Sequence, residues 1–406
     1  MTRISAVILA FYCFLGAQSA SALLTTSTLP EGINSPSFRF GQIDKVSERY
    51  TQDGTLMRLG DIKSIVFDSA TLTRMNPDAK KLIAALNSFG KHKLGDDFNF
   101  GVLRIHTLPQ VRYFAPVYAR GMTSKWTLAL GLPVVSYKNK ISISQDYSNL
   151  EYYREQFSGL SPELDEALNL DLEKATNETL QTKGYKAIAD RDESFLGDVQ
   201  VASIYKFFET PNQSLIYQAM ISLPTGPGYD PDDLAALNIF GRTSLTSTVA
   251  YSQSLSSRWS VVPYASYMLY REDSVVARVP LDEDDSLPDI ASKQSVRRQI
   301  GSANILGSNA FYEINDRWIA GVGYERLHKD GDRYSGDRGS RYDLLSKNTQ
   351  AKANRMKAEV TYSSVKSYLN KASLIPMMVS LEISDVVAGV NVERQLSQEL
   401  NLMLFF

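Results

Sequence analysis

Leu400-Asn401-Leu402-Met403-Leu404-Phe405-Phe406 ends the sequence and alternates between two faces. Successive side chains of a strand point to opposite faces, so Leu400, Leu402, Leu404 and Phe406 form one wholly apolar face. Such a face is what lipid requires of a strand whose backbone is paired by its neighbours. A buried strand of a soluble protein has the same appearance, so this stretch needs support from the rest of the chain.

The same alternation recurs along the chain, at residues 214–223, 245–251, 318–325, 357–363 and 375–383. These segments approach the 9–11 residues that a tilted membrane-spanning strand needs. A soluble β-sandwich also alternates, but aromatic residues near the segment ends favour the interfacial girdle of a membrane barrel. We therefore predict an all-β fold, a transmembrane antiparallel β-barrel of about 12–14 strands, since such barrels have an even strand number.

The composition is compatible with a barrel and excludes other classes of protein. No long apolar run follows residue 22, which excludes helical membrane spans. The 22 Tyr, 17 Phe and 3 Trp residues make the chain rich in aromatic side chains. A formal net charge of −2 indicates no nucleic-acid partner.

Residues 1–22 have the three parts of a secretory signal. These are the positive charge of Arg3, the apolar stretch Ala6–Gly16, and the small-residue cleavage site Ala20-Ser21-Ala22. A membrane anchor is the alternative, but the apolar stretch is shorter than the roughly 20 residues that a helical span needs. Cys13, the only cysteine, would leave with the signal. We expect an exported protein of the Gram-negative outer membrane that has neither a disulfide nor a thiolate metal site.

Residues 23–95 lack the regular alternation and include a helical pattern from Asn76 to Phe89, with Pro77 in its first turn and Gly90 after its end. We predict a mixed, partly helical segment that either plugs the barrel lumen or packs on its periplasmic rim. The predicted division is thus residues 1–22 as signal peptide, 23–95 as plug or periplasmic segment, and 96–406 as barrel.

The connections between strands are of two kinds. Short polar turns before Arg258-Trp259 and Arg317-Trp318 predict periplasmic hairpins, and a further hairpin is expected around Gly121–Ser124. Long polar connections at 147–194, 271–299 and 328–353 predict extracellular loops. An acidic run within the second of these lacks the glycine spacing of a calcium loop, so that we predict no metal site.

Several short motifs resemble a known family. They are Leu130-Gly131-Leu132-Pro133, Gly197-Asp198 before a strand, Leu223-Pro224-Thr225-Gly226 after the next one, and the Arg-Trp turns. Together they resemble the outer-membrane channels of meta-cleavage pathways for phenol degradation, which are similar in style to long-chain fatty-acid transporters. The resemblance implies a barrel with an N-terminal plug that passes small hydrophobic molecules, often sideways through its wall.

Charged side chains on the polar faces of the strands are candidates for the lumen: Arg104, His106, Lys206, Arg258, Glu325, Lys357, Glu359, Glu382 and Glu393. Sideways passage would need a strand kink, for which Pro263 and Pro376 are candidates, although both also suit a rim position. No cofactor and no catalytic residue is predicted, because none of the three histidines stands in a diagnostic motif with a serine or carboxylate.

The favoured function is a channel or transporter for small hydrophobic molecules, as the resemblance implies. A diffusion porin for polar solutes, a surface barrel without transport and an outer-membrane hydrolase remain alternatives. The expected partners are outer-membrane lipids, small hydrophobic solutes, and the barrel assembly machinery, which would recognise the terminal strand ending in Phe406.

Overall fold

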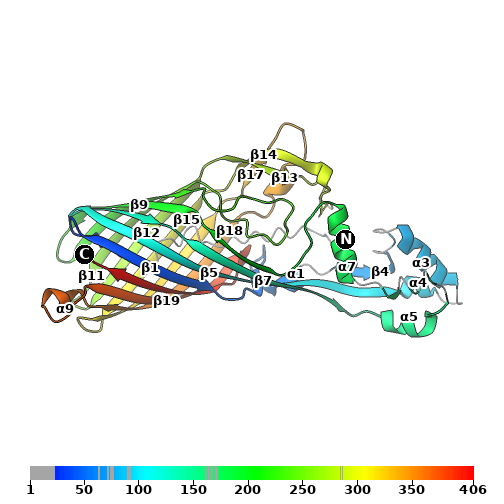
Figure 1. Ribbon diagram of the computed structural model, residues 1–406, viewed down its shortest axis with the longest axis horizontal. Helices are drawn as coiled ribbons and strands as arrows, with labels where there is room; N and C mark the ends of the chain where they lie inside the picture. Colours follow the sequence, from blue (N-terminus) through cyan, green and yellow to red (C-terminus); the bar gives the residue numbers. More distant parts are fainter. Residues whose placement is uncertain are drawn as a thin grey trace.

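Strand pairing closes the chain into an antiparallel barrel in the computed structural model. The structure describes residues 23–406 except 63–64, 71–72, 74–76, 89–92, 161, 163–164, 166–167, 170–171, 284 and 286, so the predicted signal peptide lies outside the described residues. Within this part of the chain twelve strands form the wall (Figure 1). In wall order they are β1 (Asn34–Ile43), β21 (Leu396–Leu404), β19 (Met377–Val390), β18 (Ala351–Ser363), β16 (Trp318–Lys329), β15 (Ala303–Glu313), β12 (Trp259–Tyr270), β11 (Ser244–Ser254), β10 (Gln213–Leu223), β9 (Val199–Glu209), β6 (Trp126–Gly131) and β5 (Asn99–Thr123).

The first wall strand, β1, closes the barrel by pairing with β21 on one side and with β5 on the other. The sequence-based division at residue 95 had assigned Asn34–Ile43 to the N-terminal segment. Prolines and glycines around this strand hide its alternation, and only its two partners fix it as part of the wall. The barrel therefore begins about sixty residues earlier in the chain than predicted.

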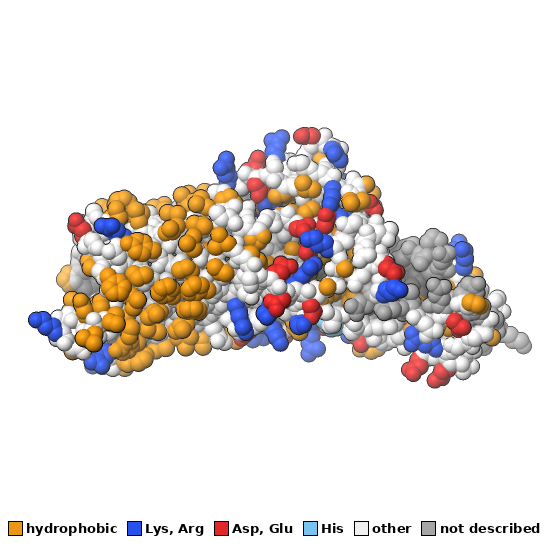
Figure 2. Space-filling model, viewed as in Figure 1, with side chains coloured by type: hydrophobic (Ala, Val, Ile, Leu, Met, Phe, Trp, Pro, Cys, Tyr) orange, Lys and Arg blue, Asp and Glu red, His pale blue; other side chains and the backbone are white. Residues whose placement is uncertain are grey.

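The two faces of the strands follow the alternation seen in the sequence. In β21, Leu396 and Leu400 are each 42% exposed, whereas Glu399 and Asn401 between and beside them are buried. On the face shown in Figure 2, the outward apolar side chains form a hydrophobic band across the barrel end on the left, with charged side chains gathered beyond it. Trp259 packs on Tyr312 and Trp318 on Tyr362 near the short turns, which matches an interfacial aromatic girdle.

Short turns lie at one end of the barrel, together with the C-terminus, and long connections lie at the other (Figure 1). Because such barrels have short periplasmic turns and long extracellular loops, the long connections mark the extracellular end. Two small sheets form there, one of β13 (Asp273–Arg278), β14 (Lys293–Gln299) and β17 (Arg333–Ser335), and one of β20 (Val392–Glu393), β2 (Glu48–Tyr50) and β3 (Leu56–Arg58).

A tall hairpin rises beyond the barrel on this side. Residues 102–110 of β5 pair with residues 138–146 of β7 (Val134–Asp146), and the first six residues of β7 pair with β8 (Arg191–Leu196). Its tip carries the helices α3 (Pro77–Ser88), α4 (Leu94–Asp97) and α5 (Leu150–Phe157) (Figure 1). The other described helices are α1 (Leu59–Ile62), α7 (Leu172–Thr182), α8 (Asp343–Ser346), α9 (Val365–Leu369) and the short 3₁₀ helix η2 (Ile290–Ser292). The remaining short strand, β4 (Ile65–Asp68), pairs with the start of β5. None of the described helices is long and apolar enough to cross a membrane.

Helix α3 confirms the predicted helical pattern but lies in neither of the two positions predicted for it. Its buried Ile83 and Leu86 pack in an apolar cluster with Phe98, Tyr153 and Phe157 at the tip of the tall hairpin. The sequence shows an apolar stripe on this helix, but it does not show that the partner surface comes from residues 98–168, at the extracellular end.

Residues 23–33, here called the lumen segment, lie inside the barrel. The Leu23 backbone N–H donates to Glu359 on β18, and the Leu24 carbonyl accepts from Asn309 on β15. The Leu29 N–H donates to Thr127 on β6, and Gly32 bonds the Gly121 carbonyl at the periplasmic rim. Because β18 and β6 stand on opposite sides of the wall, the segment crosses the lumen.

Candidate binding pocket at a break in the barrel wall

Two neighbouring wall strands break at the same height. Strand β6 ends at Gly131, and β7 resumes at Val134 after Leu132-Pro133; β8 ends at Leu196, and β9 starts after Gly197-Asp198. Proline has no N–H to give to a ladder, and so a break is expected beside Pro133. In the described chain, one backbone hydrogen bond joins the two strands between the last β6–β9 pair and the first β7–β8 pair. It runs from Gly197 N to the Pro133 carbonyl at 2.7 Å.

Asp198 ties an extracellular loop to this break. Its carboxylate accepts the backbone N–H groups of Gly226, Gly241 and Arg242 at 2.9, 3.0 and 3.3 Å. Thr225 adds a hydrogen bond to the Gly197 carbonyl at 3.0 Å. Loop 224–243, which connects β10 to β11, is therefore anchored to the wall where two strands are interrupted.

The motifs that carried the family resemblance meet here. Gly131 and Pro133 come from the first motif, Asp198 from the second and Gly226 from the third. A Cβ atom on Gly226 would lie 2.7 Å from the Phe240 Cβ, so that the close approach of the loop requires glycine. The sequence suggested these motifs, but only the fold shows that they form one structure.

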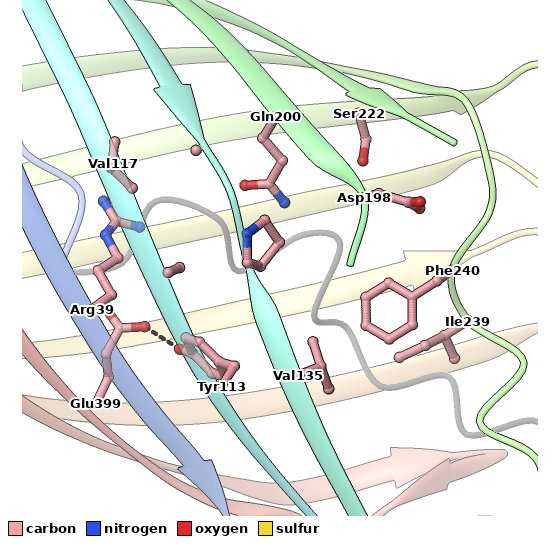
Figure 3. Close-up of a pocket in the computed structure, with 13 residues that line it drawn as sticks. Arg39, Tyr113, Val117, Val135, Asp198, Gln200, Ser222, Ile239, Phe240 and Glu399 are labelled. Carbon is pink, nitrogen blue, oxygen red and sulfur yellow. Dashed lines mark hydrogen bonds between the residues drawn. The ribbon is translucent and has the colours of Figure 1, made fainter. Parts of the chain in front are cut away.

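A cavity of about 70 Å³ lies at the break, on the lumen side of the wall (Figure 3). Its apolar lining comes from Ala115, Val117, Pro133, Val135, Ile239 and Phe240. Polar groups close its other sides, and among them the Tyr113 hydroxyl donates to Glu399. Pockets for small molecules have this mixture of apolar walls and a few placed polar groups.

The lipid-facing side of the break is apolar too. Leu130, Leu132 and Val134 are each at least 40% exposed on the outer surface, and Leu196 and Val201 on the neighbouring strand are similarly exposed. The cavity is thus separated from the hydrocarbon of the membrane only by the interrupted strands β6–β7 and β8–β9.

Loop 224–243 is held at a second point by Arg278, which is buried. The Arg278 guanidinium bonds Asp232 at 2.7 Å and lies 3.8 Å over the Tyr185 ring. Burial alone would raise the pKa of Asp232, but its hydrogen bonds from Lys293 and Arg278 hold that pKa below its ordinary value. Burial likewise raises the pKa of Tyr185 to about 12, so the ring stays neutral under the cation. These four residues are called the Arg278 clasp.

The structure places five of the nine lumen candidates on the lumen side of the wall: Lys206, Glu325, Lys357, Glu359 and Glu382. The Glu325 carboxylate pairs with Arg355 at 2.7 Å and with Lys357 at 2.8 Å, and it accepts a hydrogen bond from the Tyr264 hydroxyl. Lys206 pairs with Glu209 at 2.8 Å near the periplasmic end.

The other four candidates do not line the lumen. Arg104 and His106 belong to the tall hairpin, outside the closed part of the barrel. Arg258 is in the exposed turn between β11 and β12, and Glu393 is buried at the extracellular mouth, 3.5 Å from Arg49. For the five candidates inside the barrel the alternation gives the correct face, but it does not say how far along the barrel axis a strand continues.

One lumen residue that the sequence analysis missed is Glu399, which completes a row of three carboxylates. Glu359, Glu382 and Glu399 stand directly opposite one another on the adjacent strands β18, β19 and β21, and all three are buried. Glu399 could have been found, since it falls on the polar face of the terminal strand. That three acids share one row depends on strand register, which a single sequence does not reveal.

The two proposed kink prolines differ in position. Pro263 lies within β12, where pairing with β11 stops after Ala250–Tyr264 and resumes at Gln253–Val261 in the same register. Pro376 precedes β19 at the periplasmic rim, and its carbonyl accepts the Phe405 N–H. The break that accompanies the cavity is at Pro133 instead.

The histidines do not build a catalytic triad in the described residues. The His106 Nε2 lies 2.8 Å from Ser144 on the tall hairpin, but the neighbouring carboxylate, Asp146, is bound by Arg104. His328 lies 3.4 Å from Asp330, and the Ser302 hydroxyl donates to that carboxylate at 2.7 Å, so the serine is bonded to the acid and not to the histidine as a triad requires. No group of acidic or histidine side chains suited to a metal ion occurs in the described chain.

A family model described as "Putative MetA-pathway of phenol degradation" matches residues 125–363, more than half of the chain. The chain belongs to this family. The match spans β6 to β18 and includes the wall break, Asp198 and loop 224–243. The family predicted from short motifs is thereby confirmed. No match was found among curated proteins.

Solved structures support the fold. An outer-membrane channel from Pseudomonas putida F1 is 11% identical, with a TM-score of 0.54 over 95% of this chain and 100% of that chain. A Ralstonia pickettii toluene transporter is 11% identical over 93% of this chain and 90% of its own, but its TM-score of 0.35 supports no conclusion. The predicted antiparallel barrel and outer-membrane location are confirmed for this member of the MetA-pathway family.

Proposed function

We propose that this protein is an outer-membrane channel for small hydrophobic molecules, and that the cavity at the wall break is where such a molecule binds on its way through. The observation that carries the proposal is the place of the cavity. It lies behind two interrupted strands, with apolar side chains on both the lumen side and the lipid side of the wall.

Family membership adds support from a separate direction. The family is named for a phenol-degradation pathway, and the similar Pseudomonas putida protein is described as a channel. A small aromatic molecule matches the apolar lining, while Tyr113 and Asp198 provide polar groups at the edge. We propose transport rather than catalysis, with outer-membrane lipids as surroundings and the strand ending at Phe406 as the segment that assembly machinery recognises.

The test is uptake of radiolabelled toluene by intact Gram-negative cells that express the protein. An Ala115→Phe variant places a ring into the cavity, and an Ala265→Phe variant makes the same change on the exposed outer face of β12. We expect Ala115→Phe to reduce uptake to the level of cells without the protein and Ala265→Phe to leave it unchanged. Equal uptake by both variants would contradict the cavity as the binding site.

A polar-solute porin is the second candidate, because charged residues line the lumen. Liposome swelling in arabinose separates the two functions, since swelling requires an aqueous path for a polar sugar. We expect the protein to give no swelling while the lumen segment is in place. Rapid swelling without toluene uptake would favour the porin, and the absence of both would favour a surface barrel without transport.

A further inference from the structure

Leu23 is held in a site that matches its shape. Its side chain is 1% exposed and lies over two glycines of β16. A Cβ atom on Gly321 would come within 2.6 Å of the leucine side chain, and one on Gly323 within 2.8 Å. The glycines thus leave a notch for Leu23, whose backbone nitrogen lies 2.6 Å from the Glu359 carboxylate.

The Leu23 nitrogen lies at one end of a row of buried carboxyl groups. Glu359 stands at one end of the carboxylate row, directly opposite Glu382, which in turn faces Glu399. Cross-strand partners lie only about 4.5–5.5 Å apart, where like charges destabilise a sheet. Lys357, the lysine nearest to Glu359 in the sequence, pairs with Glu325. No described lysine or arginine side chain pairs with Glu359, whose other hydrogen bond comes from Thr361.

We propose that signal cleavage after Ala22 supplies the missing cation, and that the new α-ammonium of Leu23 binds Glu359 as a latch for the lumen segment. Hydrolysis of the Ala22–Leu23 peptide bond consumes one water, leaving a carboxylate on Ala22 and an amino group on Leu23. An α-amino group has an ordinary pKa of about 8 and is mostly protonated at neutral pH.

Signal cleavage would therefore change the type of contact between Leu23 and Glu359. An uncleaved chain offers Glu359 one neutral amide N–H, whereas the processed chain offers a charged group with three donors. Charge-assisted hydrogen bonds are about twice as strong as neutral ones. The latch fixes the inner end of the lumen segment, while Gly32 and Gly121 fix its outer end at the periplasmic rim. This inference does not depend on the proposed function, since it concerns what holds the segment, whichever solute passes.

The test uses the full mature protein, which has no cysteine after residue 22. A Thr26→Cys substitution puts a thiol on the buried part of the lumen segment, and its rate of maleimide labelling reports how often the segment leaves its place. This reporter is combined with Glu359→Gln, which removes the negative charge. The matched control is Glu382→Gln, the same change in the same row at a residue that does not touch Leu23.

A second variant keeps every barrel residue. One glutamine inserted between Ala22 and Leu23 moves the ammonium by roughly 3.3–3.6 Å, the length of one extended residue, and leaves an amide at Leu23. Intact mass identifies the first residue of each purified protein, and heat-modifiable migration shows that the barrel has folded. If Glu359→Gln fails to fold, the insertion variant decides the question alone.

We expect the purified protein without substitutions to begin at Leu23. Glu359→Gln and the insertion should each speed labelling by at least about tenfold, the scale of one lost hydrogen bond to a charged group. Combining them should add little, because both remove the same interaction, and Glu382→Gln should label at the original rate. A mature chain beginning elsewhere, or an insertion variant labelled at the original rate, would overturn the proposal.

Discussion

Glu325 holds two cations in the lumen, and it illustrates how single residues stabilise this barrel. Its oxygens bond Arg355, Lys357 and the Tyr264 hydroxyl, and the carboxylate and both cations are nearly inaccessible to solvent. Removing one partner from a buried ion pair leaves the other charge without compensation. The residue therefore matters more for stability than its place in a polar lumen suggests.

A Glu325→Gln substitution should lower the free energy of unfolding by about 3–5 kcal/mol, because two buried cations lose their carboxylate. Urea denaturation of the detergent-solubilised protein measures this change. Arg326→Gln, at an exposed neighbouring position, should change it by less than about 0.5 kcal/mol. Similar losses in both variants would contradict the role given to the buried cluster.

Asp198 is the second residue with a specific prediction. In Asp198→Ala the backbone N–H groups of Gly226, Gly241 and Arg242 lose their acceptor. Each hydrogen bond to a charged group contributes about 1.5–3 kcal/mol, so hydrogen exchange of loop 224–243 should become at least about tenfold faster. Asp192→Ala, which removes an exposed salt bridge to Lys138, is the control and should leave the loop protected. Unchanged exchange in Asp198→Ala would mean that other contacts anchor the loop.

At the scale of elements, the extracellular loops are joined by charge pairs as well as by a small apolar cluster, in which Tyr229 and Tyr334 pack against Val296. The Arg278 clasp joins Asp232, in the β10–β11 loop, to Tyr185 and Lys293, which come from two other connections. Each loop is polar in sequence and gives no sign of its partner. The prediction of extracellular loops was correct in kind, but the links between them depend on which loops the barrel brings together.

The clasp should loosen in acid. Because the folded-state pKa of Asp232 is depressed, its contribution to stability is present above the unfolded value of about 3.9 and is lost as pH falls through the lower folded value. Protection factors from hydrogen exchange of residues 183–185 and 293–298 should stay constant from pH 7 to 5 and fall below about pH 4. Asp232→Asn should show low protection throughout, and a fall shared by both proteins would assign the acid sensitivity to another group.

At the scale of the whole molecule, we expect the lumen segment to close the barrel to ions. It touches strands on opposite sides of the wall, so its removal would leave an aqueous path lined by the lumen charges. Deleting residues 23–29 behind the proposed signal sequence should turn a protein without conductance into one with stepwise conductance in planar bilayers. Steady conductance by the undeleted protein would show that the segment does not close the pore.

A disulfide offers a reversible version of this experiment. The Thr26 hydroxyl hydrogen-bonds that of Ser214 on β10, and the sequence has no cysteine after Cys13 to interfere. A Thr26→Cys, Ser214→Cys double variant should show no conductance when oxidised, even under conditions in which the single-cysteine variants conduct. When reduced, it should conduct as the single variants do. Equal conductance in both redox states would place the conducting path elsewhere.

The sequence by itself determined the barrel. Alternation of apolar and polar residues follows directly from the two-sided geometry of a strand between lipid and lumen, and it remained legible in β10, β16, β18, β19 and β21. The same alternation predicted the faces of Glu325, Lys357, Glu359 and Glu382, while turn and helix-end residues predicted the hairpin at Gly121–Ser124 and the α3 helix. Short motifs also led to the correct family.

Only the tertiary structure decided where these parts meet. It placed β1 in the wall and α3 at the extracellular tip, and it brought Pro133, Asp198 and Gly226 together around one cavity. It also aligned Glu359, Glu382 and Glu399 in one row beside Leu23. The physical reason is that barrel closure and strand register join residues that are hundreds of positions apart, whereas periodicity in a sequence reports only a side chain's nearest neighbours along its own strand.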